Sequence, residues 1–257
     1  MIFHQPHNSA GGYNYNAFFY EKEIWEPHFH KNFELIFVVS GSIICTVNGK
    51  VFTLKENEFG LCLPYDIHSI KPADNSRYWV MVFSSDYIRT FAKQISGKRA
   101  LDFSFTCQNS VREFLLSNLI NAKSPSVYLI KACLYAALGE FKELVSLCDS
   151  KEAENIGTIC LFLEKHHTED ISLKSISKLL GYDYNYVSRY FNSVFNMSFT
   201  DFLNLYRLQT ALSLLEEENK KIADIALESG FKSVRNFNCF FKKSMGLSPT
   251  EYKKSTR

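Results

Sequence analysis

Residues 230–254 read GFKSVRNFNCFFKKSMGLSPTEYKK, a stretch that concentrates aromatic, asparagine and lysine side chains toward the C-terminal end of the sequence. Phe237 and Phe241 are four residues apart and Phe240 adjoins them, which is the spacing of one apolar helix face. Asparagine, arginine and lysine side chains are then left on the other face. The stretch therefore predicts an amphipathic helix with a polar, basic surface.

The formal net charge is only +2, but it is unevenly distributed. Residues 171–257 hold 13 Lys+Arg and 8 Asp+Glu, a balance of +5. The first 170 residues hold 16 and 19, a balance of −3. A basic C-terminal part fits nucleic-acid binding, although ordinary surface variation would also fit the charge alone.

The composition is that of a globular chain with room for two modest domains, since 46% of the 257 residues are hydrophobic and 22% are charged. No apolar stretch is long enough to cross a bilayer, and the first residues lack a signal-peptide pattern. The seven cysteines are scattered without a C-x-x-C spacing. We therefore expect a cytoplasmic protein with reduced thiols, no membrane partner and no cysteine zinc site.

The C-terminal part repeats itself, at an offset of 49 residues in its first half and 50 in its second half. The matched positions are Leu173, Ile176, Ser177, Gly181, Tyr182, Phe191, Asn196, Ser198, Thr200 and Phe202 in one copy, and Ile222, Ile225, Ala226, Gly230, Phe231, Phe241, Gly246, Ser248, Thr250 and Tyr252 in the other. This repeat predicts two copies of one small helical motif.

Each copy has the parts of a helix-turn-helix, with a short helix, a glycine and a second helix. We expect the two motifs at about residues 172–196 and 221–246. Gly181 and Gly230 follow the first helix of each copy, where a residue in the left-handed conformation ends a helix most readily. The small Ser177 and its repeat partner allow the second helix to cross closely.

A linker helix is expected between the motifs, at about residues 200–217, because leucine and phenylalanine recur there at spacings of three and four. Asn196 and Gly246 occupy equivalent positions after the second helices, and both residue types tolerate the left-handed conformation. The linker would hold the two second helices about 34 Å apart, one turn of B-DNA, on the same side of the duplex.

From about residue 152 to 257 the chain resembles the AraC/XylS transcription regulators. The positions that carry the resemblance lie in register over the second motif; they are Ile222, Ile225, Ala226, Gly230, Phe231, Ser233, Phe237, Phe241, Lys242, Lys243, Gly246, Ser248, Pro249 and Tyr252. The resemblance implies sequence-specific binding of double-stranded DNA, with Asn185, Ser188 and Arg189 reading bases. The sequence departs from the family at Cys239 and Lys253, where arginine is usual.

The chemistry of these side chains agrees with that implication. Arginine can hold guanine O6 and N7, and asparagine can pair with adenine N6 and N7, whereas lysine suits phosphate. Cys239 cannot form a bidentate contact with guanine, so the second motif should recognise fewer bases. The DNA-binding candidates are Asn185, Ser188, Arg189, Asn192, Ser233, Arg235, Asn238, Cys239, Lys242 and Lys243, with Asn236 on the same helix face.

The first 108 residues are typical of β structure, because short apolar runs such as FELIFVVSG, SIICTV, KVFTL and YWVMVF alternate with turn signals. Asn48-Gly49 predicts a two-residue hairpin turn. Many short strands at near-regular spacing favour a small barrel or jelly roll.

The spacing His28-x-His30-x-x-x-Glu34, with Pro64 and His68 downstream, resembles the cupin motifs. A cupin barrel is the usual N-terminal domain of sugar-sensing AraC-type regulators, so the resemblance implies an effector-binding domain. His28, His30, Glu34 and His68 are suited to a divalent metal, but lining of an effector pocket together with Tyr65, or structural hydrogen bonding, fits them too. Trp25, Tyr65 and Trp79 could stack on a sugar or pack in the core.

Residues 109–150 should form helices that close the β domain and then a polar linker at 148–155. Small residues at Ala132, Cys133, Ala136 and Ala137 favour a seam between two copies, although packing within one chain would also use them.

The sequence thus predicts an α+β chain with a cupin-like β-barrel or jelly roll at 1–108, closing and dimerising helices at 109–150, and an all-α DNA-binding domain at 151–257. The expected function is transcription regulation without enzymatic activity, controlled by a small molecule such as a sugar. Expected partners are DNA, the effector, a second copy and the transcription machinery. The alternative is a metal-dependent cupin enzyme with a helical appendage.

Overall fold

The computed structural model describes residues 3–4, 14–195, 197–215 and 220–255, which fall into two compact units, Met1–Gly157 and Thr158–Arg257. Each unit is described by itself. Among the described residues, every helix is too short or too polar to span a bilayer.

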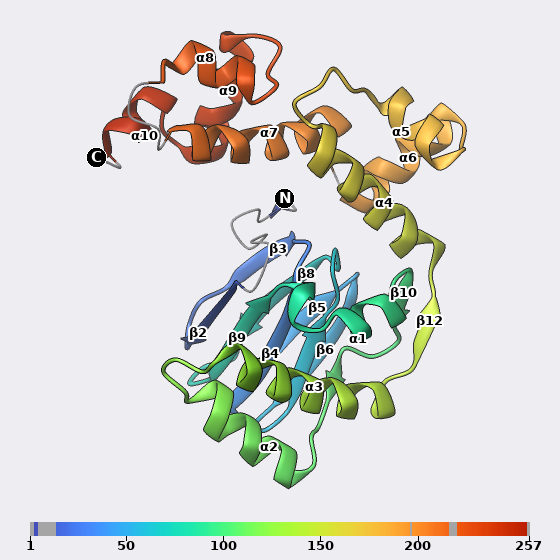
Figure 1. The fold of residues 1–257 in the computed structure, drawn as a ribbon, viewed down its shortest axis with the longest axis vertical. Helices are drawn as coiled ribbons and strands as arrows, with labels where there is room; N and C mark the ends of the chain where they lie inside the picture. The colour runs from blue at the N-terminus through green and yellow to red at the C-terminus, as the bar shows by residue number, and fades with distance from the viewer. Residues whose placement is uncertain (1–2, 5–13, 196, 216–219, 256–257) are drawn as a thin grey trace. The chain divides into compact units, whose positions relative to one another are not determined.

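The first unit is built on two five-stranded sheets (Figure 1). One sheet has the order β1-β3-β8-β5-β6 and the other the order β11-β7-β4-β9-β2, while β10 and β12 form a separate pair. The strands are β1 (Phe3–His4), β2 (Tyr15–Tyr20), β3 (Trp25–Phe29), β4 (Phe33–Ser40), β5 (Ser42–Val47), β6 (Lys50–Lys55), β7 (Phe59–Cys62), β8 (His68–Pro72), β9 (Arg77–Phe83), β10 (Lys98–Ala100), β11 (Ser104–Phe105) and β12 (Leu147–Asp149). The predicted β fold class is confirmed.

The hairpin between β5 and β6 has the predicted two-residue turn. Asn48 and Gly49 have φ angles of 49° and 80°, and Val47 pairs with Lys50 across the turn. Positive φ at both central residues is what a type I′ turn requires, and asparagine followed by glycine adopts it at least cost.

The sheet that contains β4 is buried on both faces, which explains why FELIFVVS reads as a continuous apolar run rather than an alternating one. Ile36 and Val38 point between the two sheets, whereas Leu35 and Phe37 pack under helices. The covering helices are η2 (Ser85–Tyr87), α1 (Arg89–Gln94), α2 (Asn109–Leu115), the π-helical turn η3 (Leu116–Ile120) and α3 (Val127–Leu144) (Figure 1).

Two expectations about the segment after residue 108 need correction. The small-residue stripe of α3 is divided, because Cys133 and Ala137 are buried in the core while Ala132 is exposed. The polar stretch at 148–155 is not a loose linker. It contains the end of β12, which pairs with β10, and the start of α4 (Lys151–His166).

The second unit is helical and repeats, as predicted. Its elements after α4 are α5 (Leu173–Leu180), α6 (Tyr184–Phe195), α7 (Phe199–Leu215), α8 (Ile222–Glu228), α9 (Val234–Met245) and α10 (Pro249–Ser255). Gly181 and Gly230 have φ angles of 72° and 89°, and Phe191 and Phe241 are both buried. α7 links the two helix-turn-helix motifs (Figure 1).

The helix stop at Gly246 is confirmed by its φ of 76°. Its repeat partner Asn196 lies outside the described residues, as do the last two positions of the predicted linker helix.

Candidate functional site

The second helix of the first motif, α6, has one buried and one exposed face. Val187, Phe191 and Phe195 are buried, because they follow each other at four-residue spacing along one side of the helix. The four predicted DNA-binding residues of this helix lie outside that stripe. Asn185, Arg189 and Asn192 are exposed and Ser188 is half-buried.

The corresponding helix of the second motif, α9, is arranged in the same way. Phe237 and Phe241 are buried, and the exposed predicted residues are Arg235, Asn238, Cys239, Lys242 and Lys243. Ser233 differs from the others because it caps the helix, its hydroxyl accepting a hydrogen bond from the Asn236 backbone N–H at 3.2 Å. That bond gives Ser233 a structural role in addition to the predicted one.

Residues of both motifs line one hollow, a surface pocket of about 540 Å³. From α6 it is lined by Ser188 and Asn192, and from the second motif by Lys232 and Asn236. The polar sides of the two motifs are therefore not turned away from each other. Lys232 was not among the predicted residues. It pairs with Asp170 at 2.7 Å, a residue 62 positions away in the sequence.

A buried arginine that was also absent from the predicted residues stabilises this unit. Arg207, only 4% exposed, donates hydrogen bonds from α7 to the backbone oxygens of His167 at 2.8 Å and Glu169 at 3.0 Å. His167 in turn contacts the Thr210 hydroxyl at 2.7 Å. Because a buried guanidinium needs such acceptors, these bonds hold the segment after α4 against α7.

Lys253 stands where arginine is usual in the resembling family. Its ammonium donates a hydrogen bond to the Lys220 backbone oxygen at 2.9 Å, so it ties α10 to the residues before α8. The departure at Cys239 places an exposed thiol on α9.

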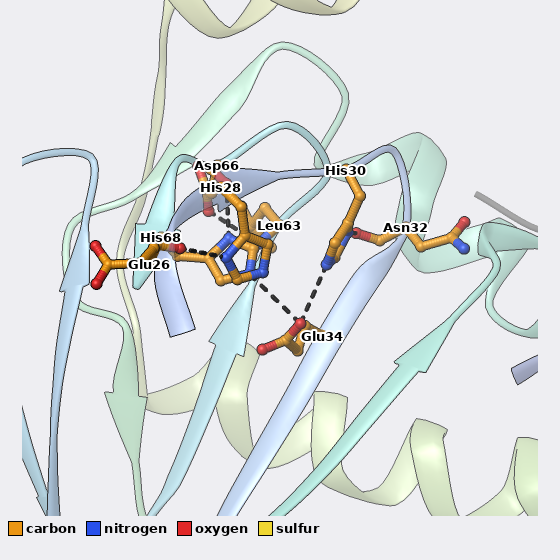
Figure 2. Close-up of polar contacts among 8 residues, drawn as sticks. All are labelled: Glu26, His28, His30, Asn32, Glu34, Leu63, Asp66 and His68. Atoms are coloured by element: carbon orange, nitrogen blue, oxygen red, sulfur yellow. Dashed lines mark hydrogen bonds and ion pairs between the residues drawn. The ribbon is translucent and has the colours of Figure 1, made fainter. Parts of the chain in front are cut away.

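The first unit brings four predicted residues together at one end of its sheets (Figure 2). His28 on β3 pairs across the strands with His68 on β8, His30 follows the end of β3, and Glu34 lies on β4 in the other sheet. Each of the four is at most 3% exposed. One ligand atom from each lies within 4.8 Å of the others, so the arrangement could hold a single ion.

Glu34 lies at the centre of this histidine cluster, which is defined by His28, His30, Glu34 and His68. Its Oε2 atom is 3.1 Å from Nε2 of His30 and 3.4 Å from Nε2 of His68. Burial disfavours the charged forms of Glu34 and His68, but the attraction between these two side chains outweighs it. The pKa of Glu34 therefore lies well below its ordinary value, and the pKa of His68 lies above its ordinary value. Burial, and then the nearby His68, lower the pKa of His28 to about 3.

The aromatic candidates around the cluster differ in position. Tyr65 is half-buried, with a φ of 67°, and its backbone N–H donates to the His30 oxygen at 2.8 Å. Trp25 is half-buried, with its ring 6.1 Å from that of His28. Trp79 is buried in the core beneath the helices, so of its two predicted roles the structure supports core packing.

A separate hollow of about 170 Å³ lies in the first unit. Asn48, Asp66 and Arg99 are among the polar residues that line it, and none of the five predicted effector-binding residues does. These lining residues come from distant parts of the chain, so sequence spacing offered no signal for them.

Comparison with known proteins assigns both units. Residues 19–138 match the model of an AraC-like ligand binding domain, and residues 176–255 match that of a helix-turn-helix domain. The fold matches that of ToxT from Vibrio cholerae with a TM-score of 0.58 and 17% identity, over 95% of this chain and 98% of that one.

Curated relatives match about two fifths of this chain. An uncharacterized HTH-type transcriptional regulator of Staphylococcus aureus is 31% identical over 100 residues, which are 39% of this chain and 13% of that protein. The HTH-type regulator YtdP of Bacillus subtilis is 31% identical over 105 residues, which are 40% and 14% of the two chains. The matched segment is thus a small part of these relatives. With an AraC-like ligand binding domain followed by a helix-turn-helix domain, the chain has the domain organisation of the AraC-type transcription regulators.

Proposed function

We propose that this protein regulates transcription by binding a specific DNA sequence with both helix-turn-helix motifs. The observation that carries the proposal is the common hollow, lined by Ser188 and Asn192 of α6 and by Asn236 of α9. Arg189 and Asn185 are exposed on the same helix, α6, and have the chemistry to read guanine and adenine. The two motifs would enter successive major grooves.

The second motif is proposed to contribute more to affinity than to sequence reading. Lys242 and Lys243 are exposed in the last turn of α9, where they suit phosphate. Cys239, on the same helix, lacks the paired donors that hold guanine. Arg235 and Asn238 remain its proposed base-reading residues.

A mobility-shift assay on DNA upstream of the protein's own gene tests this function. We expect retardation whose affinity falls steeply with salt, because each neutralised phosphate releases counterions. Six phosphate contacts would lower the affinity about a thousandfold between roughly 50 and 200 mM salt. An unrelated fragment of equal length is the control. Equal binding to both fragments, or no retardation, would contradict the proposal.

A small-molecule effector is proposed to act on the first unit by favouring one state of the protein over another through differential affinity. From the resemblance, the predicted effector is a sugar. ToxT has been solved with an unsaturated fatty acid bound, so a thermal-shift screen should include both chemical classes. Catalysis is not proposed, because the histidine cluster is almost fully shielded from solvent and a substrate would have to reach it.

A homodimer is proposed through the outer face of α3, with the transcription machinery as a further partner of the regulator. Tyr128, Ala132, Tyr135 and Gly139 lie on this exposed face, at the three- and four-residue spacing of one helical stripe. Their small and aromatic side chains would allow two helices to pack closely.

Ala132→Glu should convert the proposed dimer to a monomer, because a carboxylate would be buried without a partner at the seam. Sedimentation velocity measures the mass directly. Lys93→Glu, an exposed position on α1, is the matched control and should remain dimeric. A monomeric wild-type protein, or a dimeric Ala132→Glu variant, would refute this interface.

A further inference from the structure

We propose that His28, His30, Glu34 and His68 bind one divalent late first-row transition-metal ion, which joins the two sheets of the first unit. His28 and His68 belong to one sheet and Glu34 to the other. The site does not depend on the proposed DNA binding, because metal content is measured on the protein alone.

The backbone holds all three imidazoles by the same ring nitrogen, Nδ1. The Nδ1 atom of His28 lies 2.8 Å from the Glu26 oxygen, that of His30 lies 3.0 Å from the Asn32 oxygen, and that of His68 lies 2.8 Å from the Asp66 oxygen (Figure 2). A carbonyl oxygen can only accept, so each Nδ1 must carry a proton. In the neutral rings every Nε2 then presents a lone pair, and this outer support of metal-binding histidines fixes the ring as well as the tautomer.

When the three rings are neutral, the atoms that face the centre of the cluster are therefore all acceptors. Glu34 contributes a carboxylate, and the Nε2 atoms of His30 and His68 point toward its Oε2 at 3.1 and 3.4 Å. Among the described residues, Nε2 of His68 has no well-aligned hydrogen-bond partner. A proton could satisfy one pair of these acceptors, whereas a cation at the centre would satisfy all four.

The donor set and the spacing select the ion. Three imidazole nitrogens and one carboxylate oxygen suit zinc, cobalt, nickel or copper, whereas calcium and magnesium prefer oxygen donors. With zinc–ligand bonds of about 2.0–2.1 Å, tetrahedral donors lie about 3.3 Å apart. The largest separation here is 4.8 Å, so small rotations of the side chains would close the site.

Binding should be measured on the full chain after removal of metals with a chelator. We expect one zinc ion per chain by elemental analysis, and cobalt(II) should give d–d absorption bands without a thiolate charge-transfer band. Zinc at about 100 times its Kd should raise the melting temperature by roughly 5–10 °C. A thiolate band would place the ion on cysteine and overturn the proposal, as would less than half an equivalent of bound metal.

Glu34→Gln keeps the side-chain shape and removes the charge. It should weaken zinc binding by more than the roughly 100-fold that loss of an outer partner costs. His166→Gln, at a half-buried histidine that contacts Glu169, is the matched control and should bind like the wild type. Zinc bound equally well by a folded Glu34→Gln variant would refute the assignment. If circular dichroism shows that the variant is unfolded, the cobalt spectrum of the wild type decides.

Discussion

Replacing Arg189 with alanine should weaken binding to the specific DNA site by roughly 5- to 150-fold. A bidentate arginine–guanine contact is worth about 1–3 kcal/mol of discrimination, and each 1.4 kcal/mol is tenfold in affinity. The side chain is exposed on α6, opposite the buried Val187 and Phe191, so its loss should leave the fold intact. Binding to unrelated DNA should change little beyond the loss of one charge.

Comparison with a Lys243→Ala variant separates recognition of bases from attraction to phosphate. This lysine is exposed in the last turn of α9, and a phosphate contact carries no sequence information. Its loss should weaken binding to specific and unrelated DNA alike and lower the salt slope by about 1. Titrations of both variants on both DNAs, with footprinting, provide the measurement. If Arg189→Ala kept the wild-type footprint and affinity, Arg189 would not read a base.

Gly230→Ala should destabilise the second unit by about 2–5 kcal/mol. The left-handed conformation costs a residue with a Cβ about 1–2 kcal/mol, and Gly230 has a φ of +89°. An added Cβ would also lie 2.6 Å from Cα of Thr168 and 2.9 Å from the His167 oxygen. Both are backbone atoms that cannot rotate aside, and overpacking of this kind costs typically 1–3 kcal/mol.

Gly181→Ala is the matched control supplied by the internal repeat. Gly181 occupies the equivalent position with a φ of +72°, but a Cβ there meets nothing within 4 Å. It should therefore cost only about 1–2 kcal/mol, the conformational part alone. Equal destabilisation by the two substitutions would show that the close approach to Thr168 does not matter.

Urea unfolding can separate the units in this experiment. Trp25 and Trp79, the two tryptophans, both lie in the first unit, so their fluorescence reports on that unit. Far-UV circular dichroism follows the helices, most of which lie in the second. Gly230→Ala should shift the dichroism transition to lower urea and leave the fluorescence transition in place.

The sequence alone determined the features that depend on short spacings. The amphipathic faces of α6 and α9 and the glycines with positive φ follow from residues within one or two helical turns, and the repeat follows from matching two segments of the sequence. The Asn48-Gly49 hairpin is equally local. The four residues of the histidine cluster were also identified, because three of them lie within seven positions, from the end of β3 to the start of β4.

Only the tertiary structure decided which polar atoms meet across the fold. It buried Arg207 against the oxygens of His167 and Glu169, divided the small residues of α3 between core and surface, and paired β12 with β10 where a linker was expected. These outcomes depend on contacts between residues some 40 to 50 positions apart. The periodicity of one segment carries no information about which distant segment will cover it, and burial is decided by that partner.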